Sequence, residues 1–168
     1  EGMRRVLAER DNLLLEANTV STTRKALDLT ARRLETDAGP MLIVEIHVDV
    51  KDSMGANVVN SMCELMRPAV EALTGGRVNM AILSNLSTGR MVRVHARVSA
   101  GRLGDTIIDD FVKASAFAEA DPYRAVTHNK GIMNGVSAVL LATGNDTRAV
   151  EAGAHAYASL RGAYKPLS

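Results

Sequence analysis

The most regular pattern in the chain is an alternation of apolar and polar positions that follows the turn signal Gly39-Pro40. One set of alternate positions is entirely aliphatic and consists of Leu42, Val44, Ile46, Val48 and Val50. The other set includes Glu45, His47 and Asp49. A period of two predicts a β-strand with one buried face and one exposed face. His47, on the polar face, is expected to be a solvated histidine.

Two further strands are predicted downstream, over Arg77–Ser84 and Met91–Ser99, and the second alternates as regularly as the first strand does. Its apolar positions are Val92, Val94, Ala96 and Val98, and Arg93, His95 and Arg97 lie between them. Glycines at positions 75 and 76 and the polar residues 85–90 predict turns before each of these strands.

Helical spacing of apolar residues predicts helices over Glu1–Ala17, over a segment that starts near Val58, and over Asp105–Ala120. Pro68 is expected to kink or interrupt the second of these helices. The apolar stripe of the third is expected to face inward, and it comprises Ile107, Ile108, Phe111, Val112 and Ser115. Residues 24–34 fit a helical or irregular segment.

The resulting order of strand, helix, strand, strand and helix predicts an α+β fold, a small antiparallel sheet with helices on one face. A doubly wound dinucleotide-binding fold needs repeated parallel units and a GxGxxG turn after a strand, and the sequence contains no such turn.

Composition narrows the class of protein. The 168 residues match one average domain, and with 46% hydrophobic but only 3% aromatic residues the core must be aliphatic. A net charge of +1 without long basic runs argues against a nucleic-acid surface. Cys63 is the single cysteine, which excludes an internal disulfide and fits the reducing cytoplasm. We expect its side chain to behave as a small, buried apolar group. No apolar run approaches the roughly 20 residues of a membrane span.

The chain begins within a helical pattern, at Glu1-Gly2-Met3, and stops after Pro166-Leu167-Ser168 without a closing element. We therefore expect an internal fragment of a longer protein.

The stretch from Asp121 to Ala158 contains the first candidate chemistry. Its residues His128 to Gly135 predict a polar, glycine-bounded loop around Lys130, and loops of this kind position functional groups. A held lysine can donate to a developing oxyanion. On spacing alone, a solvated loop lysine is the more common explanation.

Asp146 precedes a helix of small residues, at the end where the helix dipole favours a carboxylate. A capping role and a catalytic role are both compatible with this position. Glu151 and His155 fit a surface pair four residues apart. The small face of this helix, which consists of Ala149, Ala152, Gly153 and Ala156, predicts close approach of another helix.

A third candidate is the connection between the first predicted strand and the helix after it, Asp52-Ser53-Met54-Gly55-Ala56-Asn57. Amides at a helix N-terminus can bind an anion such as a phosphate, and Gly55 permits close approach. Without further information, an ordinary connection capped by Asp52 or Ser53 is favoured. Four scattered histidines and one cysteine give no metal-ligand spacing.

Three segments taken together closely resemble the 3-hydroxy-3-methylglutaryl-coenzyme A reductases, in particular the class II enzymes of bacteria and archaea. These segments are DVKDSMGANVVNSMCE (Asp49–Glu64), DPYRAVTHNKGIMNG (Asp121–Gly135) and ATGNDTRAVEAGAHAYA (Ala142–Ala158). The resemblance extends over nearly the whole chain. It implies a metal-free oxidoreductase that interconverts HMG-CoA with mevalonate and coenzyme A in isoprenoid biosynthesis, using two nicotinamide hydrides.

By this resemblance, Lys130 is the catalytic lysine, Asn134 a supporting amide and Asp146 the catalytic aspartate, which holds the lysine charged and aimed. Cofactor contacts are implied for Asp52, Met54, Gly55, Asn57 and, near the nicotinamide, Asn85; Ser53 replaces a more usual alanine. The resemblance also implies a small NAD(P)-binding domain over residues 18–120, with residues 1–17 and 121–168 in a large substrate-binding domain.

The family's catalytic glutamate and its thiolate-protonating histidine match nothing in these residues, so the chain alone is expected to be inactive. The family forms homodimers with active sites at the subunit interface. Hydroxyls beside Arg24 and Lys25 would tolerate a 2′-phosphate, which favours NADPH over NADH. The alternative is a non-catalytic module that binds a dinucleotide or coenzyme A.

Overall fold

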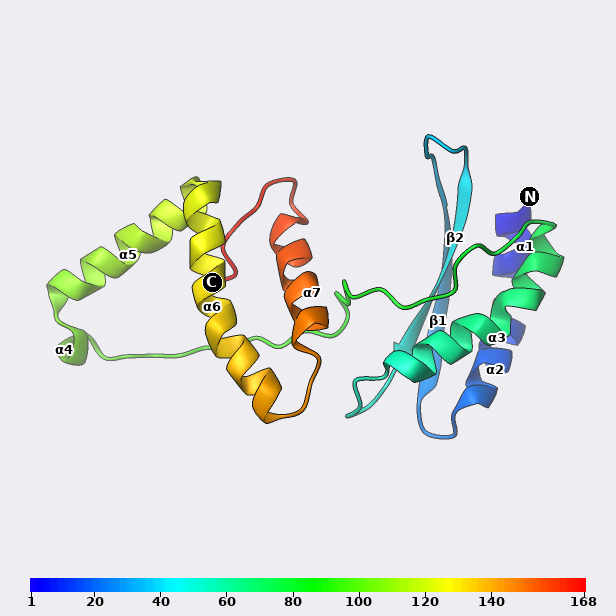
Figure 1. Ribbon diagram of the computed structural model, residues 1–168, viewed down its shortest axis with the longest axis horizontal. Coiled ribbons are helices and arrows are strands. Elements are labelled where there is room, and N and C mark those ends of the chain that lie inside the picture. The colour runs from blue at the N-terminus through cyan, green and yellow to red at the C-terminus, as the bar shows by residue number, and fades with distance from the viewer. The chain divides into compact units, whose positions relative to one another are not determined.

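The computed structural model describes residues 1–168, and the chain divides into two compact units, Glu1–Leu83 and Ser84–Ser168 (Figure 1). The first unit holds a two-stranded antiparallel sheet, and the second is built from helices and extended segments. Each unit is described by itself below.

The sheet of the first unit pairs β1 (Lys25–Leu34) with β2 (Met41–Asp49). The alternation of apolar residues predicted β2 correctly, since its aliphatic set packs against the core. The connecting turn contains Gly39, whose φ of +102° suits glycine.

The segment that became β1 was expected to be helical or irregular, and this prediction is wrong. The register of β1 shifts between Ala26 and Asp28, so Leu27 is an extra, bulged residue and is 63% exposed. The core residues of β1, Ala26 and Leu29, are therefore three positions apart, a spacing typical of helices. The bulge concealed the period of two that identifies a strand.

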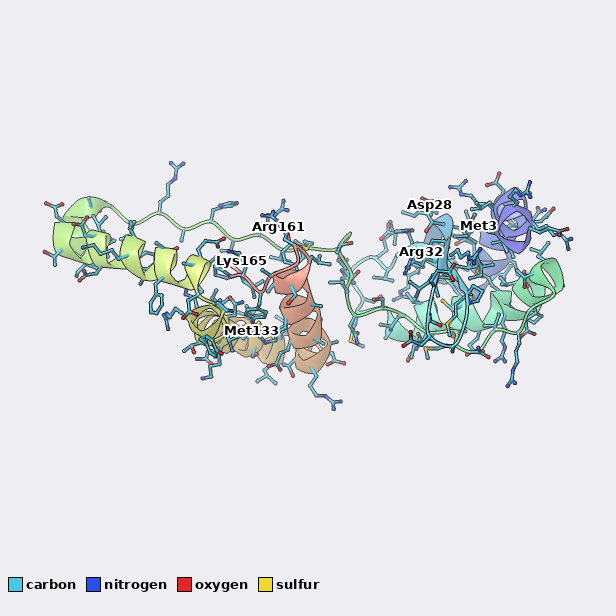
Figure 2. All side chains as sticks on the ribbon, turned by 90° about the horizontal axis from the view of Figure 1, so that it is seen from above. Met3, Asp28, Arg32, Met133, Arg161 and Lys165 are labelled. Carbon is cyan, nitrogen blue, oxygen red and sulfur yellow. The ribbon has the colours of Figure 1, made fainter.

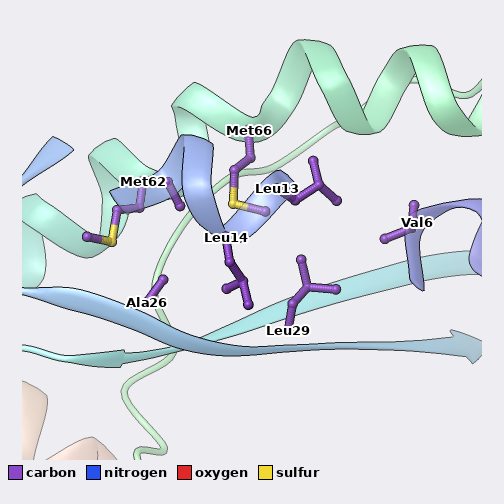
Figure 3. Close-up of a cluster of buried hydrophobic side chains, with 8 residues drawn as sticks. Val6, Leu13, Leu14, Ala26, Leu29, Met62 and Met66 are labelled. Atoms are coloured by element: carbon purple, nitrogen blue, oxygen red, sulfur yellow. The ribbon is translucent and has the colours of Figure 1, made fainter. Parts of the chain in front are cut away.

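Three helices cover one face of this sheet: α1 (Gly2–Ala8), α2 (Arg10–Ala17) and α3 (Ala56–Thr74) (Figures 1 and 3). A short 3-10 turn, η1 (Asn18–Val20), follows α2. Side chains from all three helices and from β1 form the buried cluster of Val6, Leu13, Leu14, Ala17, Ala26, Leu29, Met62 and Met66. The predicted mixed α+β class, with helices on one face of a small antiparallel sheet, is confirmed, and the core is aliphatic as the composition required.

Two helix predictions need adjustment in this unit. The helix expected over Glu1–Ala17 is divided at Glu9 into α1 and α2. Pro68 does not interrupt α3, which continues through it to Thr74.

Polar side chains tie the N-terminal helices to β1. The Arg10 guanidinium donates to Asp28 Oδ1 from Nε at 3.1 Å and from Nη2 at 2.7 Å, and this bond lowers the pKa of Asp28. Asn18 Nδ2 donates to the Ala26 carbonyl oxygen at 3.1 Å, and Ala26 N donates to Asn18 Oδ1 at 2.8 Å. The Asn18 amide thus satisfies both backbone groups of one strand residue.

The strands predicted over Arg77–Ser84 and Met91–Ser99 are not formed, because neither segment pairs with a strand. Val92 and Val94 are 89% and 86% exposed. Alternation predicts which side chains share a face, but a strand also requires a hydrogen-bonded neighbour, and this chain supplies none.

The second unit contains α4 (Ala100–Leu103), α5 (Asp105–Ala120), α6 (Pro122–Ala142) and α7 (Thr147–Ser159). The bounds of α5 match the prediction, but its apolar stripe does not face inward. Ile107, Phe111 and Val112 are exposed, and only Ala118, near the end of the helix, is buried.

Cys63 on α3 is half-buried and free, and burial raises the pKa of its thiol. The protonated thiol is a poor nucleophile, so a packing role fits better than catalysis. None of the helices combines the length and apolarity that crossing a membrane requires.

The bulge in β1 predicts that Leu29 and Leu27 contribute unequally to the free energy of unfolding. Replacing Leu29, which is 2% exposed, with Ala should lower the free energy of unfolding by about 2–5 kcal/mol, because it leaves a cavity in the core. Leu27→Ala, two residues away on the same strand, should change it by less than about 0.5 kcal/mol. Chemical denaturation of the two variants measures the difference, and equal losses would contradict the register of β1.

Candidate functional site

The segment around Lys130 is helical, so the loop predicted over His128 to Gly135 is wrong. Asp121 is the N-cap of α6, and its carboxylate accepts from the amides of Tyr123 and Arg124 at 3.3 and 3.2 Å. Pro122 occupies the first helical position, where its missing amide hydrogen is harmless. Asp121 followed by Pro122 was the sequence signal for the start of a helix. The glycines around Lys130 suggested a loop instead.

Lys130 and Asn134 lie about one turn apart on α6. They line a hollow of about 370 Å³ together with Glu151 and His155 of α7. Its remaining lining residues are Met133, Ser137, Ala138 and Leu141. The structure therefore brings the predicted catalytic lysine and its supporting amide to one site, between an acid and a histidine that were not assigned to it.

His155 is held from two sides. Its Nε2 lies 3.9 Å from Glu151 Oε1, which confirms the pair expected from their spacing. Its Nδ1 is 2.6 Å from the Tyr164 hydroxyl, and the two rings stack with centroids 6.0 Å apart. The contact with Tyr164 depends on the chain's return after α7, which no local pattern signals.

Asp146 caps α7, as one of its two expected roles required, and its Oδ1 accepts from Ala149 N at 3.0 Å. It lines a second hollow, of about 250 Å³, together with Asn85, Arg148 and Ala149. Asp146 and the predicted nicotinamide neighbour Asn85 are thus brought together. Lys130 and Asp146 form no ion pair within 4.0 Å, and they line different hollows.

At Gly153, the small face of α7 accommodates a backbone segment. A Cβ added at Gly153 would lie 2.6 Å from the Asn85 carbonyl oxygen. The absence of a side chain at this position lets Asn85 approach α7, near the helix end that carries Asp146.

The other predicted contacts gather in the first unit, on the connection between β2 and α3. Asp52, Met54 and Asn57 are exposed, and Gly55 has a left-handed φ of +83°. Gly55 is the N-cap of α3, and no side chain caps this helix, so the expected capping by Asp52 or Ser53 is wrong. A side chain at Gly55 would overlap Val50.

Ser53 anchors this connection instead. Its hydroxyl donates to the Val50 carbonyl oxygen at 2.7 Å and accepts from Arg24 Nε at 2.9 Å. The guanidinium of Arg24 is thereby held beside the uncapped N-terminus of α3, where helix amides favour anions. No group of three or more His, Cys, Asp or Glu side chains is arranged to hold a metal ion.

Comparison with known proteins identifies the group to which these segments are similar. The family model described as hydroxymethylglutaryl-coenzyme A reductase matches residues 2–166. The 3-hydroxy-3-methylglutaryl-coenzyme A reductase of Archaeoglobus fulgidus is 48% identical, with 97% of this chain and 38% of that protein covered.

Solved structures give the same result. A 3-hydroxy-3-methylglutaryl-coenzyme A reductase from Streptococcus pneumoniae matches with a TM-score of 0.88 and 41% identity, over 99% of this chain and 42% of that chain. The class II enzyme from Streptococcus pneumoniae bound to NADPH in open conformations matches with a TM-score of 0.85 and 37% identity, with the same coverage. The chain thus spans about two fifths of the length of these relatives.

The contact at Gly153 predicts an unequal response to added methyl groups. Gly153→Ala should lower the free energy of unfolding by about 1–3 kcal/mol, because the Asn85 backbone must move. Gly135→Ala on α6, where a Cβ meets nothing within 4 Å, should raise it by up to about 1 kcal/mol through better helix propensity. Thermal denaturation of both variants tests this, and a stabilised Gly153→Ala protein would contradict the contact.

Proposed function

The chain belongs to the hydroxymethylglutaryl-coenzyme A reductase family, and we propose that the protein containing it interconverts HMG-CoA with mevalonate and coenzyme A. The observation that carries the proposal is the family match over residues 2–166, which includes every predicted site segment. The hollow shared by Lys130 and Asn134 supports it, because a charged donor and an amide converge there.

Lys130 is the proposed electrostatic catalyst. Reduction of a thioester carbonyl creates negative charge on its oxygen, and an ammonium aimed at that oxygen lowers the barrier. Asn134, one helical turn away on the same hollow, adds a neutral donor or acceptor that orients the substrate. Two molecules of the reduced nicotinamide cofactor, bound one after the other, would each supply one hydride.

Asp146 is the proposed partner of this lysine in the complete protein. Its carboxylate lies at the N-terminus of α7, at the positive end of the helix dipole. Asn85 lines the same hollow, which supports its proposed position near the nicotinamide. In this chain the two hollows are separate, so joining the two residues requires closure or residues outside the chain.

The residues of the first unit fit a dinucleotide. The N-cap of α3 is Gly55, which has no side chain to cap the helix, so first-turn amides are available to a phosphate. Gly55 also permits a close approach between the phosphate and the backbone. Asp52, Met54 and Asn57, which flank this position in the sequence, are exposed and are the proposed cofactor contacts. The related Streptococcus pneumoniae enzyme bound to NADPH supports a nicotinamide cofactor.

The proposal includes the organisation implied by the family. Residues 18–120 form the cofactor domain, and residues 1–17 and 121–168 belong to a substrate-binding domain. The functional unit is a homodimer whose active site lies at the subunit interface. Cys63, a free thiol, fits a reducing compartment such as the cytoplasm.

A non-catalytic module that binds a dinucleotide or coenzyme A is the second candidate. It is favoured only by the separation of Lys130 from Asp146 in this chain. The two candidates differ in turnover, since both predict binding.

Lys130→Met in the full-length protein should lower kcat for HMG-CoA reduction by about 10²–10³-fold, with little change in the cofactor KM, because one oxyanion donor is lost. Lys113→Met, which removes an exposed lysine from α5, is the matched control and should leave kcat unchanged. Steady-state oxidation of NADPH measures both variants. Full activity of Lys130→Met would exclude the proposed mechanism.

Cofactor choice is tested at Arg24. We expect the full-length protein to prefer NADPH, because a guanidinium held by Ser53 can pair with a 2′-phosphate. Arg24→Gln should raise the KM for NADPH by about tenfold or more and leave the KM for NADH nearly unchanged. A parent protein that prefers NADH, or an equal effect on both cofactors, would refute this assignment.

A further inference from the structure

Asn129, the residue before Lys130, is the one buried polar residue of the chain and has an exposed fraction of 0%. Its neighbours at helical spacing, Ala125 and Met133, are buried with it, so this stripe of α6 faces the interior of the unit. A buried amide is costly unless its donor and acceptor are both satisfied. The partners of Asn129 therefore indicate what this stripe holds.

Both partners lie in the extended segment that follows α7. Asn129 Nδ2 donates to the Lys165 carbonyl oxygen at 2.9 Å, and Leu167 N donates to Asn129 Oδ1 at 2.8 Å. In a parallel β-sheet, the backbone of one residue bonds in the same way to the two residues on either side of its partner in the next strand. The Asn129 side chain thus takes the place of a neighbouring β-strand. Pro166 occupies the intervening position, where no amide hydrogen is needed.

The same segment contacts the other two helices through Lys165. Lys165 N donates to the Ala158 carbonyl oxygen of α7 at 3.0 Å. Lys165 Nζ donates to the Glu119 carbonyl oxygen of α5 at 2.7 Å and lies 3.1 Å from Glu119 Oε1. Lys165 thus connects α5, α6 and α7, and Figure 2 shows it among these helices.

The segment also fixes a wall of the hollow that contains Lys130. Tyr164, directly before Lys165, holds the ring of His155, which lines that hollow from α7. At the other end of the segment, Ser168 Oγ lies 2.9 Å from His128 Nε2. The two walls of the hollow, α6 and α7, are therefore joined by residues 164–168.

We propose that Asn129 is a positioning residue for Lys130. By clamping residues 165–167 onto α6, its amide sets the separation between the wall that carries Lys130 and Asn134 and the wall that carries Glu151 and His155. This inference rests on the proposed function for its catalytic consequence. A displacement of about 1 Å at a reacting group can cost on the order of 10²-fold in rate.

Asn129→Asp in the full-length protein gives the sharpest test, because it changes one donor and nothing in shape. An ionised carboxylate keeps the acceptor for Leu167 N but turns an oxygen toward the Lys165 carbonyl oxygen. Protonation restores a donor, and burial raises the pKa of such a carboxyl above its ordinary range. The lost function should therefore return as the pH falls through that raised pKa.

The expected result is a kcat reduced about tenfold or more at pH 8, with an unchanged KM for NADPH, and a ratio to the parent that rises as the pH is lowered toward about 6. Other titratable groups lie around Asn129 in both proteins, namely His128 on α6, His155 with Tyr164 and Glu151, and the Lys165–Glu119 pair. Comparing the variant with the parent at each pH removes their contribution.

A second measurement does not depend on turnover. Acetic anhydride labelling should change the reactivity of Lys130 relative to the exposed Lys113 in Asn129→Asp. Asn18→Asp is the matched control. It makes the same change to the Asn18 side chain, which pairs with the Ala26 backbone in the first unit, and should leave the ratio of Lys130 to Lys113 labelling unchanged. If Asn129→Asp does not fold, Asn129→Ser replaces it, and a reduced kcat with altered labelling but no recovery at low pH is then expected.

The outcomes separate the two proposals. A parent protein that does not turn over HMG-CoA refutes the proposed function, and the positioning of Lys130 is then decided by labelling alone. Parent-like kcat in a folded Asn129 variant overturns the inference. A reduced kcat with a constant ratio across pH and unaltered Lys130 labelling also overturns it, because that result indicates a general loss of structure.

Discussion

The organisation of this chain depends on the need to pair every buried polar group. No buried side-chain nitrogen or oxygen lacks a hydrogen-bond partner. Each unit contains an asparagine whose side-chain amide both donates to and accepts from backbone groups of a distant segment. Asn18 pairs with Ala26 at the start of β1, and Asn129 pairs with the segment after α7. A core of aliphatic side chains provides most of the stabilisation but little directionality, so these amides determine register and position.

The two hollows follow from this arrangement. One lies between α6 and α7, whose separation depends on the segment clamped by Asn129, and the other forms where Gly153 lets the Asn85 backbone approach α7. The proposed chemistry uses a cation and a carboxylate together, and in this chain Lys130 of α6 and Asp146 at the start of α7 line different hollows.

Sequence patterns predicted the elements whose signals are local. β2 alternates over nine residues, α5 has regular spacing, and Asp146 caps α7 as its position suggested. The errors arose where a distant partner decides the outcome. The bulge at Leu27 concealed β1, and the regular alternation around Val94 found no neighbouring strand. Lys130 was proposed as a site residue through family resemblance alone, and its local structure was mistaken. Asn129 could not be found because its partners are 36 and 38 residues away.

The clamp at Asn129 also has a consequence for synthesis. A ribosome that adds about 5–20 residues per second needs roughly 2–7 s to pass from Asn129 to Lys165. During that interval α6 can form, but the side-chain amide of Asn129 has to be hydrated. The Lys165 carbonyl and the Leu167 amide, which later replace water as its partners, have not yet been synthesised. The helices of the second unit therefore cannot close around a dry interior until the segment after α7 has been made. The order of translation places this segment after all three helices that it connects.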